Sequence, residues 1–264
     1  METYVLFFVA TIVAGGINTL AGGGGLITFP LLMLVVPPVT ADATSAVALF
    51  SPYPTAVWRT RSQLTSAVRQ WWLWLLLIPS LLGGLLGALL LSWSGDRNFV
   101  VLVPWLMLIA TLLILLQPVL VRHSNSDHRQ PNFAPWLRPV AVVTTFVVAL
   151  YGGYFGAGIG ILMISALSLM RMGDMRRVVA LKNLLAGCLR SVAVVVLIIE
   201  GTVNWGYAVP MVLGGLVGGY LGGLVSHRAN PAVLRWLVIG IGFVVAAYYF
   251  WRLYGPPVMH VGGE

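Results

Sequence analysis

The stretch AGGINTLAGGGGL, residues 14–26, interrupts an apolar run that extends from Thr3 to Val36. A second stretch, LYGGYFGAGIGI at residues 150–161, interrupts another apolar run in the same way. Neither can be one continuous helix, because clustered glycines lose much backbone entropy on folding. At membrane depth, irregular backbone is tolerated only where it is buried in protein or lines a wet cavity. Two such breaks, in corresponding positions of two halves, are typical of the binding site of a transporter.

The composition indicates a membrane protein. Of the 264 residues, 59% are hydrophobic and 8% are charged, and the mean hydropathy is +0.94. The net charge of +8 does not predict a nucleic-acid partner, because the arginines lie at the ends of apolar runs, as the positive-inside rule expects. The single cysteine, Cys188, excludes a disulfide framework. Residues 1–14 lack a basic segment and a cleavage site, so they are expected to be mature protein and not a signal peptide.

The order of segments suggests two halves. A polar stretch at residues 122–136 separates them and is predicted to be a cytoplasmic linker, between a first transmembrane repeat at 1–121 and a second at 137–264. Each half begins with a broken run, at 3–36 and 139–170, and continues with three predicted helices. These are 41–58, 71–92 and 99–121 in the first half, and 178–199, 205–226 and 231–253 in the second. Thr40 is expected to cap the helix that starts at residue 41.

The halves also match in their glycine and proline positions. Aligning Gly22 with Gly156 places Gly24 on Gly158. Aligning Pro79 with Pro210 places Gly83, Gly84 and Gly87 on Gly214, Gly215 and Gly218. These latter glycines, which have small-xxx-small spacing, are expected to allow close helix packing.

Each broken run is either a strongly kinked span or two half-helices that fold back as a re-entrant hairpin. Full spans would divide the basic residues almost evenly between the two sides of the membrane. Hairpins would leave only Arg97 and Arg252 on one side, which the positive-inside rule favours. We therefore predict an all-α polytopic membrane protein of two inverted repeats. Each repeat has a broken or re-entrant helical hairpin and three transmembrane helices, and both termini lie outside.

Three segments together resemble the sulfite exporter TauE/SafE family over nearly the whole chain. They are GGINTLAGGGGLITFP at 15–30, its echo GGYFGAGIG at 152–160, and GTVNW at 201–205 followed by GGLVG at 214–218. The resemblance implies export, or in some members import, of sulfite, organosulfonates or related sulfur oxyanions. Many relatives carry an acidic residue just ahead of the glycine cluster. This chain has Asn18 there and Gly152 in the second half, which argues against coupling by an acid at those two positions.

The glycine breaks predict an anion site. A helix that starts after a glycine cluster presents unpaired N–H groups and the positive end of its dipole. We expect the two breaks to meet near the bilayer midplane and to hold one anion. The predicted substrate-binding residues are Asn18, Gly22, Gly23, Gly24, Gly25, Thr44, Ser45, Gly156, Gly158, Gly160, Lys182, Asn183 and Arg190.

The charged residues of the apolar segments leave alternatives open. Lys182 and Arg190 lie about 80° apart on a predicted helix, since each residue turns it by about 100°, and intramembrane cations suggest function. Lys182 could equally extend its ammonium to the headgroups. Asp42, Glu200 and Asp174 are the acids nearest the bilayer, and no acid is expected in the middle of a span. The histidines of the linker, His123 and His128, are expected to be solvated, and no metal or cofactor is predicted.

The combined prediction is a secondary transporter of a small anion in the cell inner membrane, working by alternating access. No catalytic arrangement of nucleophile, base and acid can be recognised, so the chain is not expected to be an enzyme. The expected partners are a small anionic substrate and the lipid bilayer, and a homo-oligomer is left open. The alternatives are a non-transporting membrane scaffold and a transporter of a different small solute.

Overall fold

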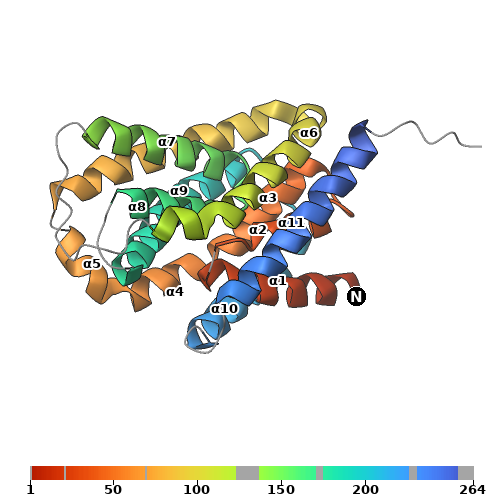
Figure 1. Cartoon of the computed structure of the whole chain (residues 1–264). Helices are drawn as coiled ribbons and strands as arrows, with labels where there is room; N and C mark the ends of the chain where they lie inside the picture. The colour runs from red at the N-terminus through yellow and green to blue at the C-terminus, as the bar shows by residue number, and fades with distance from the viewer. Residues whose placement is uncertain are drawn as a thin grey trace, which may run out of the picture.

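The computed structural model describes residues 2–20, 22–68, 70–122, 137–170, 175–225 and 231–254. The regular structure of these residues is helical (Figure 1). The helices are α1 (Glu2–Leu20), α2 (Gly25–Leu32), α3 (Pro38–Phe50), α4 (Pro52–Arg59), α5 (Arg61–Val68), α6 (Trp71–Arg122), α7 (Leu137–Tyr154), α8 (Ile159–Leu169), α9 (Met175–Ile199), α10 (Trp205–Val225) and α11 (Pro231–Tyr254). The predicted all-α fold class is confirmed. Residues 123–136 of the predicted linker, with His123 and His128, and Asp174 lie outside the described residues.

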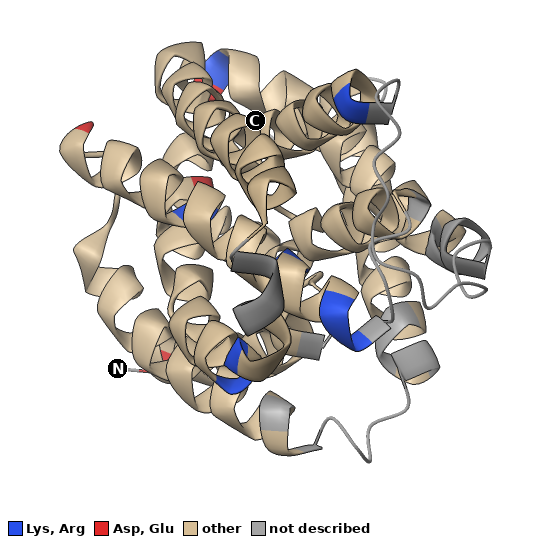
Figure 2. Cartoon of the chain, turned by 90° about the vertical axis from the view of Figure 1, so that its left-hand side faces the viewer, with Lys and Arg blue, Asp and Glu red and all other residues tan. Residues whose placement is uncertain are grey.

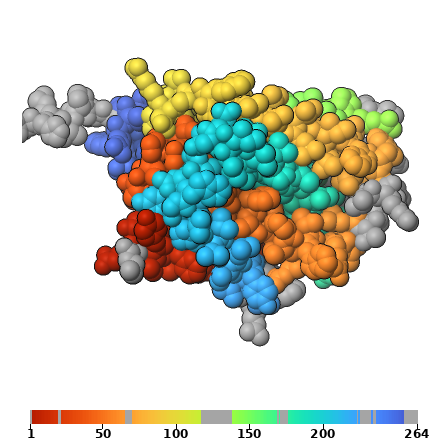
Figure 3. Space-filling view, turned by 180° about the vertical axis from the view of Figure 1, so that it is seen from behind, coloured from red at the N-terminus to blue at the C-terminus, as the bar shows by residue number. Residues whose placement is uncertain are grey.

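Four helical segments of the described chain are long and apolar enough to cross a bilayer. They are Glu2–Thr19, Trp71–Leu116, Arg176–Ile199 and Trp236–Tyr254. Within α6, Gly95 has non-helical angles (φ 65°, ψ 160°), so α6 is two helices joined between the predicted helices 71–92 and 99–121. Figure 3 shows α10 and the end of α9 at the surface of one face, between α6 and α1. Many side chains on the outer faces of these helices are large, apolar and exposed, as expected for a multi-pass membrane protein in contact with lipid.

Both predicted helix breaks are present. The first lies between α1 and α2, where Gly22 has a φ of 88°, and the second lies between α7 and α8, where Gly156 and Gly158 have φ of 69° and 76°. These are left-handed backbone conformations that only glycine adopts without strain. The glycine clusters therefore end one helix and allow the next to start in a new direction.

The predicted helix at 41–58 is wrong in two respects. It is broken at Ser51, because α4 starts at Pro52, whose missing N–H ends the hydrogen-bond ladder of α3. It also begins earlier than predicted, at Pro38, and its N-terminal cap does not come from Thr40. Instead, the N–H of Val39 donates to Oδ1 of Asp96 at 2.9 Å. A carboxylate at a helix N-terminus is favourable, and this bond attaches the start of α3 to the turn inside α6.

Glycines bring α1 and α10 into close contact. A Cβ atom added to Gly214 would lie 2.5 Å from the carbonyl oxygen of Phe8, and one added to Gly218 would collide with the carbonyl oxygen of Ile12. The contact advances by four residues on both helices, so α1 and α10 run parallel. Their backbones approach closely because no side chain stands between them.

The first part of α6 packs against α7 in the same manner. A Cβ atom added to Gly83 would lie 2.6 Å from the carbonyl oxygen of Phe146, and one added to Gly87 would collide with that of Leu150. These helices also run parallel. The sequence alignment places Gly83 and Gly87 on Gly214 and Gly218. Glycines that align in the sequence therefore make the same kind of contact, in which the backbone of one helix approaches a carbonyl oxygen of its parallel neighbour.

We expect Gly218→Val to destabilise the fold strongly, because its side chain would occupy the space of the Ile12 carbonyl and separate α1 from α10. Gly240→Val on α11 is the matched control, since nothing lies within 4 Å of its added Cβ. Thermal unfolding of the detergent-purified proteins should show a Tm several degrees lower for Gly218→Val and a nearly unchanged Tm for Gly240→Val. Equal Tm values would contradict the close packing of α1 on α10.

Candidate functional site

The two glycine breaks touch each other. A Cβ atom added to Gly22 would lie 2.5 Å from the Cα atom of Gly160, and one added to Gly25 would lie 3.1 Å from the Cα atom of Ala157. The start of α2 is thereby brought against the start of α8. This contact confirms the expectation that segments more than 130 residues apart in the chain meet.

The other glycines of the predicted site pack against different neighbours. The added Cβ of Gly23 would lie 2.8 Å from Cγ1 of Val238 on α11, and that of Gly158 would lie 3.5 Å from Cβ of Ala110 on α6. Gly24 packs against α1, where its nearest side-chain atom is Cβ of Asn18 at 3.0 Å. These positions hold the breaks in place among the surrounding helices.

Arg190 of α9 brings a positive charge to the second break. Its side chain is only 6% exposed, and its guanidinium lies against the Cα atom of Gly156, where any Cβ would overlap it. Nη1 has no hydrogen-bond partner among the described residues. An arginine whose charge is buried and whose donors are incompletely used is suited to bind an anion.

A polar cluster from five helices surrounds this arginine. Arg190 lies within electrostatic range of Asp42 on α3, Tyr53 on α4 and Tyr151 on α7. The side chain of Asn18, on α1, lies close to that of Tyr53. The hydroxyl of Tyr151 donates to the carbonyl oxygen of Ala157 at 3.0 Å, which ties α7 to the second break. We call Asn18, Asp42, Tyr53, Tyr151 and Arg190 the Arg190 cluster.

Asp42 is the main residue that sequence reasoning missed. Asp42 was named only as one of the acids nearest the bilayer, but its side chain is 3% exposed and lies within the helix packing. The expectation that no acid lies in the middle of a span stays a prediction, because α3 is not one of the four candidate spans. Its Oδ2 has no hydrogen-bond partner among the described residues. The sequence feature that could have identified Asp42 is its position in α3, where it lies between Thr40 and Thr44 in a segment that is mostly apolar. Tyr53 and Tyr151 were missed as well, and nothing in their sequence surroundings distinguishes them from packing aromatics.

The structure gives Thr44 and Ser45 structural hydrogen bonds. Oγ of Ser45 and Oγ1 of Thr28 lie 2.6 Å apart, which joins α3 to α2. Oγ1 of Thr44 accepts from the N–H of Asn204 at 3.0 Å, which fixes the segment just before α10. These hydroxyls hold the helices around the site, and no contact brings them to Arg190.

Lys182 and Asn183 lie two turns before Arg190 on α9, about 12 Å away along the helix axis. Both are buried, and Lys182 is 0% exposed. The Nζ atom of Lys182 has no hydrogen-bond partner within the described part of the chain. The alternative that Lys182 extends to the headgroups is therefore wrong, because its ammonium does not reach the surface. No hydrogen bond or ion pair of the described residues joins Lys182 to the Arg190 cluster. The structure therefore does not bring Lys182 and Arg190, both predicted site residues, together.

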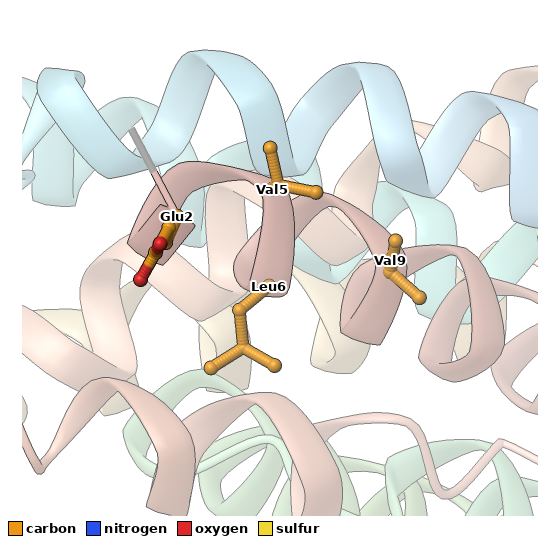
Figure 4. Close-up of a pocket in the computed structure, with 4 residues that line it drawn as sticks. All are labelled: Glu2, Val5, Leu6 and Val9. Atoms are coloured by element: carbon orange, nitrogen blue, oxygen red, sulfur yellow. The ribbon is translucent and has the colours of Figure 1, made fainter.

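A surface hollow on α1 is distinct from this cluster. It has a volume of about 530 Å³ and is lined by Glu2, Val5, Leu6 and Val9 (Figure 4). The three apolar side chains are exposed on the outer face of α1. The hollow therefore belongs to the lipid-facing surface, and its lining residues lie about two and a half to four and a half helical turns before Asn18.

Arginines outside the cluster lie at helix ends. Arg59 ends α4, Arg61 begins α5, and Arg138 follows the first residue of α7. Figure 2 views the molecule from the end where α7 begins, and few of the ribbons in this view are coloured as charged residues. The guanidiniums of Arg61 and Arg138 stack on Trp58 and Trp71 at 4.1 and 4.6 Å from the ring centroids. Arginine on tryptophan at a helix end is typical of a membrane interface.

The helical fold and the buried, charged Arg190 cluster indicate a membrane transporter. The family model "Sulfite exporter TauE/SafE" matches residues 7–249, and the chain belongs to that family, which consists of membrane transporters and not of enzymes.

Two relatives cover the chain almost completely. "Probable membrane transporter protein YfcA" of Escherichia coli K12 is 26% identical over 258 residues, which cover 97% of this chain and 92% of the relative. "Probable membrane transporter protein" of Haemophilus influenzae is 26% identical over 249 residues, 94% of each chain. No solved structure matches.

Proposed function

We propose that this protein is a secondary transporter of a small anion, a sulfur oxyanion such as sulfite or an organosulfonate, with the anion held at the two glycine breaks. The observation that carries the proposal is Arg190, a buried arginine whose guanidinium lies on Gly156 and whose Nη1 lacks a hydrogen-bond partner in the part of the chain that the structure describes. The planar guanidinium can donate two parallel hydrogen bonds to two oxygens of a sulfonate or sulfite group.

Backbone groups at the breaks would complete the site. The starts of α2 and α8 carry the positive ends of their helix dipoles, and they lie together where Gly22 meets Gly160. In the first turn of α2, the N–H groups of Leu26 and Ile27 already donate to Gly23 and Gly24. The N–H of Gly22 also donates already, to the carbonyl oxygen of Ile17. The N–H groups of Gly23, Gly24 and Gly25 are therefore the backbone donors of the first break that we assign to the anion.

The proposal includes an arrangement of two inverted repeats, which is the arrangement that alternating access commonly uses. The inverted arrangement is supported by the pair of matching glycine contacts, α1 with α10 and α7 with α6. In Figure 1, α1 begins at the end of the molecule opposite to that where α7 begins, as inversion requires. Asn18, Asp42 and Arg190 are all buried, so the two repeats would have to move relative to each other to admit a substrate.

We expect the purified protein in proteoliposomes to give saturable currents with at least one of sulfite, sulfoacetate and thiosulfate, and none with chloride. Radiotracer uptake with the same anions detects electroneutral exchange, and protein-free liposomes are the control. Lys182→Ala is included to test whether the buried lysine contributes to affinity. Absence of both current and uptake for every sulfur oxyanion would refute this substrate class. If the protein is instead a non-transporting scaffold, we expect neither current nor uptake for any sulfur oxyanion, and no binding of these anions to the purified protein.

A further inference from the structure

We infer that Asp42 couples the transporter to protons: anion binding at Arg190 is linked to proton uptake by the Asp42 carboxylate. The substrate would then cross the membrane together with a proton. This inference rests on the proposed function, since it assigns the coupling ion to the same site.

The arrangement of the two side chains carries the inference. Asp42 on α3 and Arg190 on α9 are both buried and lie within electrostatic range of each other. Even so, Oδ2 of Asp42 and Nη1 of Arg190 both lack hydrogen-bond partners in the described chain. No hydrogen bond or ion pair among the described residues joins the two side chains, so the carboxylate balances the charge of Arg190 at a distance and leaves guanidinium donors for an anion.

A bound anion would disturb this balance. With an anion on Arg190, an ionised Asp42 would leave an excess negative charge in a buried site, which is strongly unfavourable. A proton on Asp42 removes one negative charge, which restores the balance for a singly charged sulfonate and reduces the excess for a dianion such as sulfate. It also turns the carboxylate from an acceptor into a donor that can face the anion. Anion binding and proton uptake therefore favour each other, and this linkage is reciprocal by thermodynamic necessity.

Among the described residues of the helices around α3, no charged residue other than Arg190 acts on Asp42. Neither α2 nor α10 contains an acidic or basic residue, and the charged residue of α1, Glu2, stands at its start. Asp96 of α6 is bonded to the N–H of Val39 at the beginning of α3. Of the two tyrosines in the cluster, Tyr53 lies beside Asn18, and the hydroxyl of Tyr151 donates to the carbonyl oxygen of Ala157. Arg190 is the cation that acts on Asp42 in the described part of α9.

The test uses the purified full-length protein with thiosulfate and sulfate, whose own charges stay constant between about pH 6 and 8. Calorimetric Kd values for the wild type should rise with pH, by up to about tenfold per pH unit for one linked proton. A pH-sensitive dye inside proteoliposomes should report protons that enter with the anion. Asp42→Asn mimics the protonated carboxyl, so its Kd should be independent of pH, and anion uptake should no longer move protons.

Glu200→Gln is the control, because Glu200 is an exposed acid at the end of α9, and its Kd should keep the pH dependence of the wild type. The inference is overturned, and the proposed function kept, if Asp42→Asn keeps that dependence or if the wild type takes up anion without protons. If Asp42→Asn does not fold, the dye measurement on the wild type still shows whether protons enter with the anion, and uptake without protons overturns the inference. If neither anion binds the wild type, the same titrations are made with sulfoacetate, whose charge is also constant over this pH range. If no sulfur oxyanion binds at any pH, the proposed function fails, and this inference fails with it.

Discussion

Replacing Arg190 with alanine is expected to raise the Kd for the sulfur oxyanion at least about 100-fold. Two charge-assisted hydrogen bonds are lost, each worth about 1.5–3 kcal/mol, and every 1.4 kcal/mol is about a tenfold change in Kd. Arg190→Lys should recover part of the affinity, because it keeps the charge but loses the planar pair of donors. Calorimetric titration of the purified variants with the anion that the wild type transports is the measurement.

Two controls separate this effect from misfolding. Arg252→Ala removes an exposed arginine in the last turn of α11 and should leave the Kd unchanged. Arg190→Ala by itself leaves Asp42 as an uncompensated buried acid, a situation that typically costs about 3–5 kcal/mol. The double variant with Asp42→Asn removes both charges and should therefore regain thermal stability without regaining affinity. Anion binding of wild-type strength by a folded Arg190→Ala protein would show that the arginine does not hold the substrate.

Gly156→Ala is expected to damage both stability and binding. Gly156 has a φ of 69°, and a side chain in this left-handed conformation costs about 1–2 kcal/mol. In addition, the new methyl group would occupy the space of the Arg190 guanidinium. The arginine would have to leave the break, so the Kd should rise about as far as in Arg190→Ala.

Gly201→Ala provides the matched control for this prediction. Gly201 has nearly the same φ, 68°, but nothing lies within 4 Å of its added Cβ. Its substitution measures the conformational cost alone, so it should lower the Tm modestly and leave the Kd unchanged. Thermal unfolding and calorimetric titration of both variants make the comparison. Similar behaviour of the two variants would mean that contact with Arg190 is not what makes Gly156 necessary.

The sequence alone was sufficient to locate the two breaks and the glycines that pack helices together. Runs of glycine inside long apolar segments cannot stay helical, and their matching positions in the two halves indicate a repeat. The contact of Gly22 with Gly160 and the glycine contacts of α10 with α1 follow these expectations. Such features are local, because they depend on residue type and spacing along a single segment.

The composition of the polar cluster was decided by the tertiary structure. Asp42, Tyr53 and Tyr151 come from three different helices, and each is brought near Arg190 by packing between segments about 40 to 150 residues away. Packing also gave Thr44 and Ser45 other partners and kept Lys182 apart from the cluster. Hydropathy and helical periodicity place a residue in a span, but they do not determine which helices become neighbours. The sequence therefore determined where the helices break, and only the packing of five helices decided which charged and polar side chains meet there.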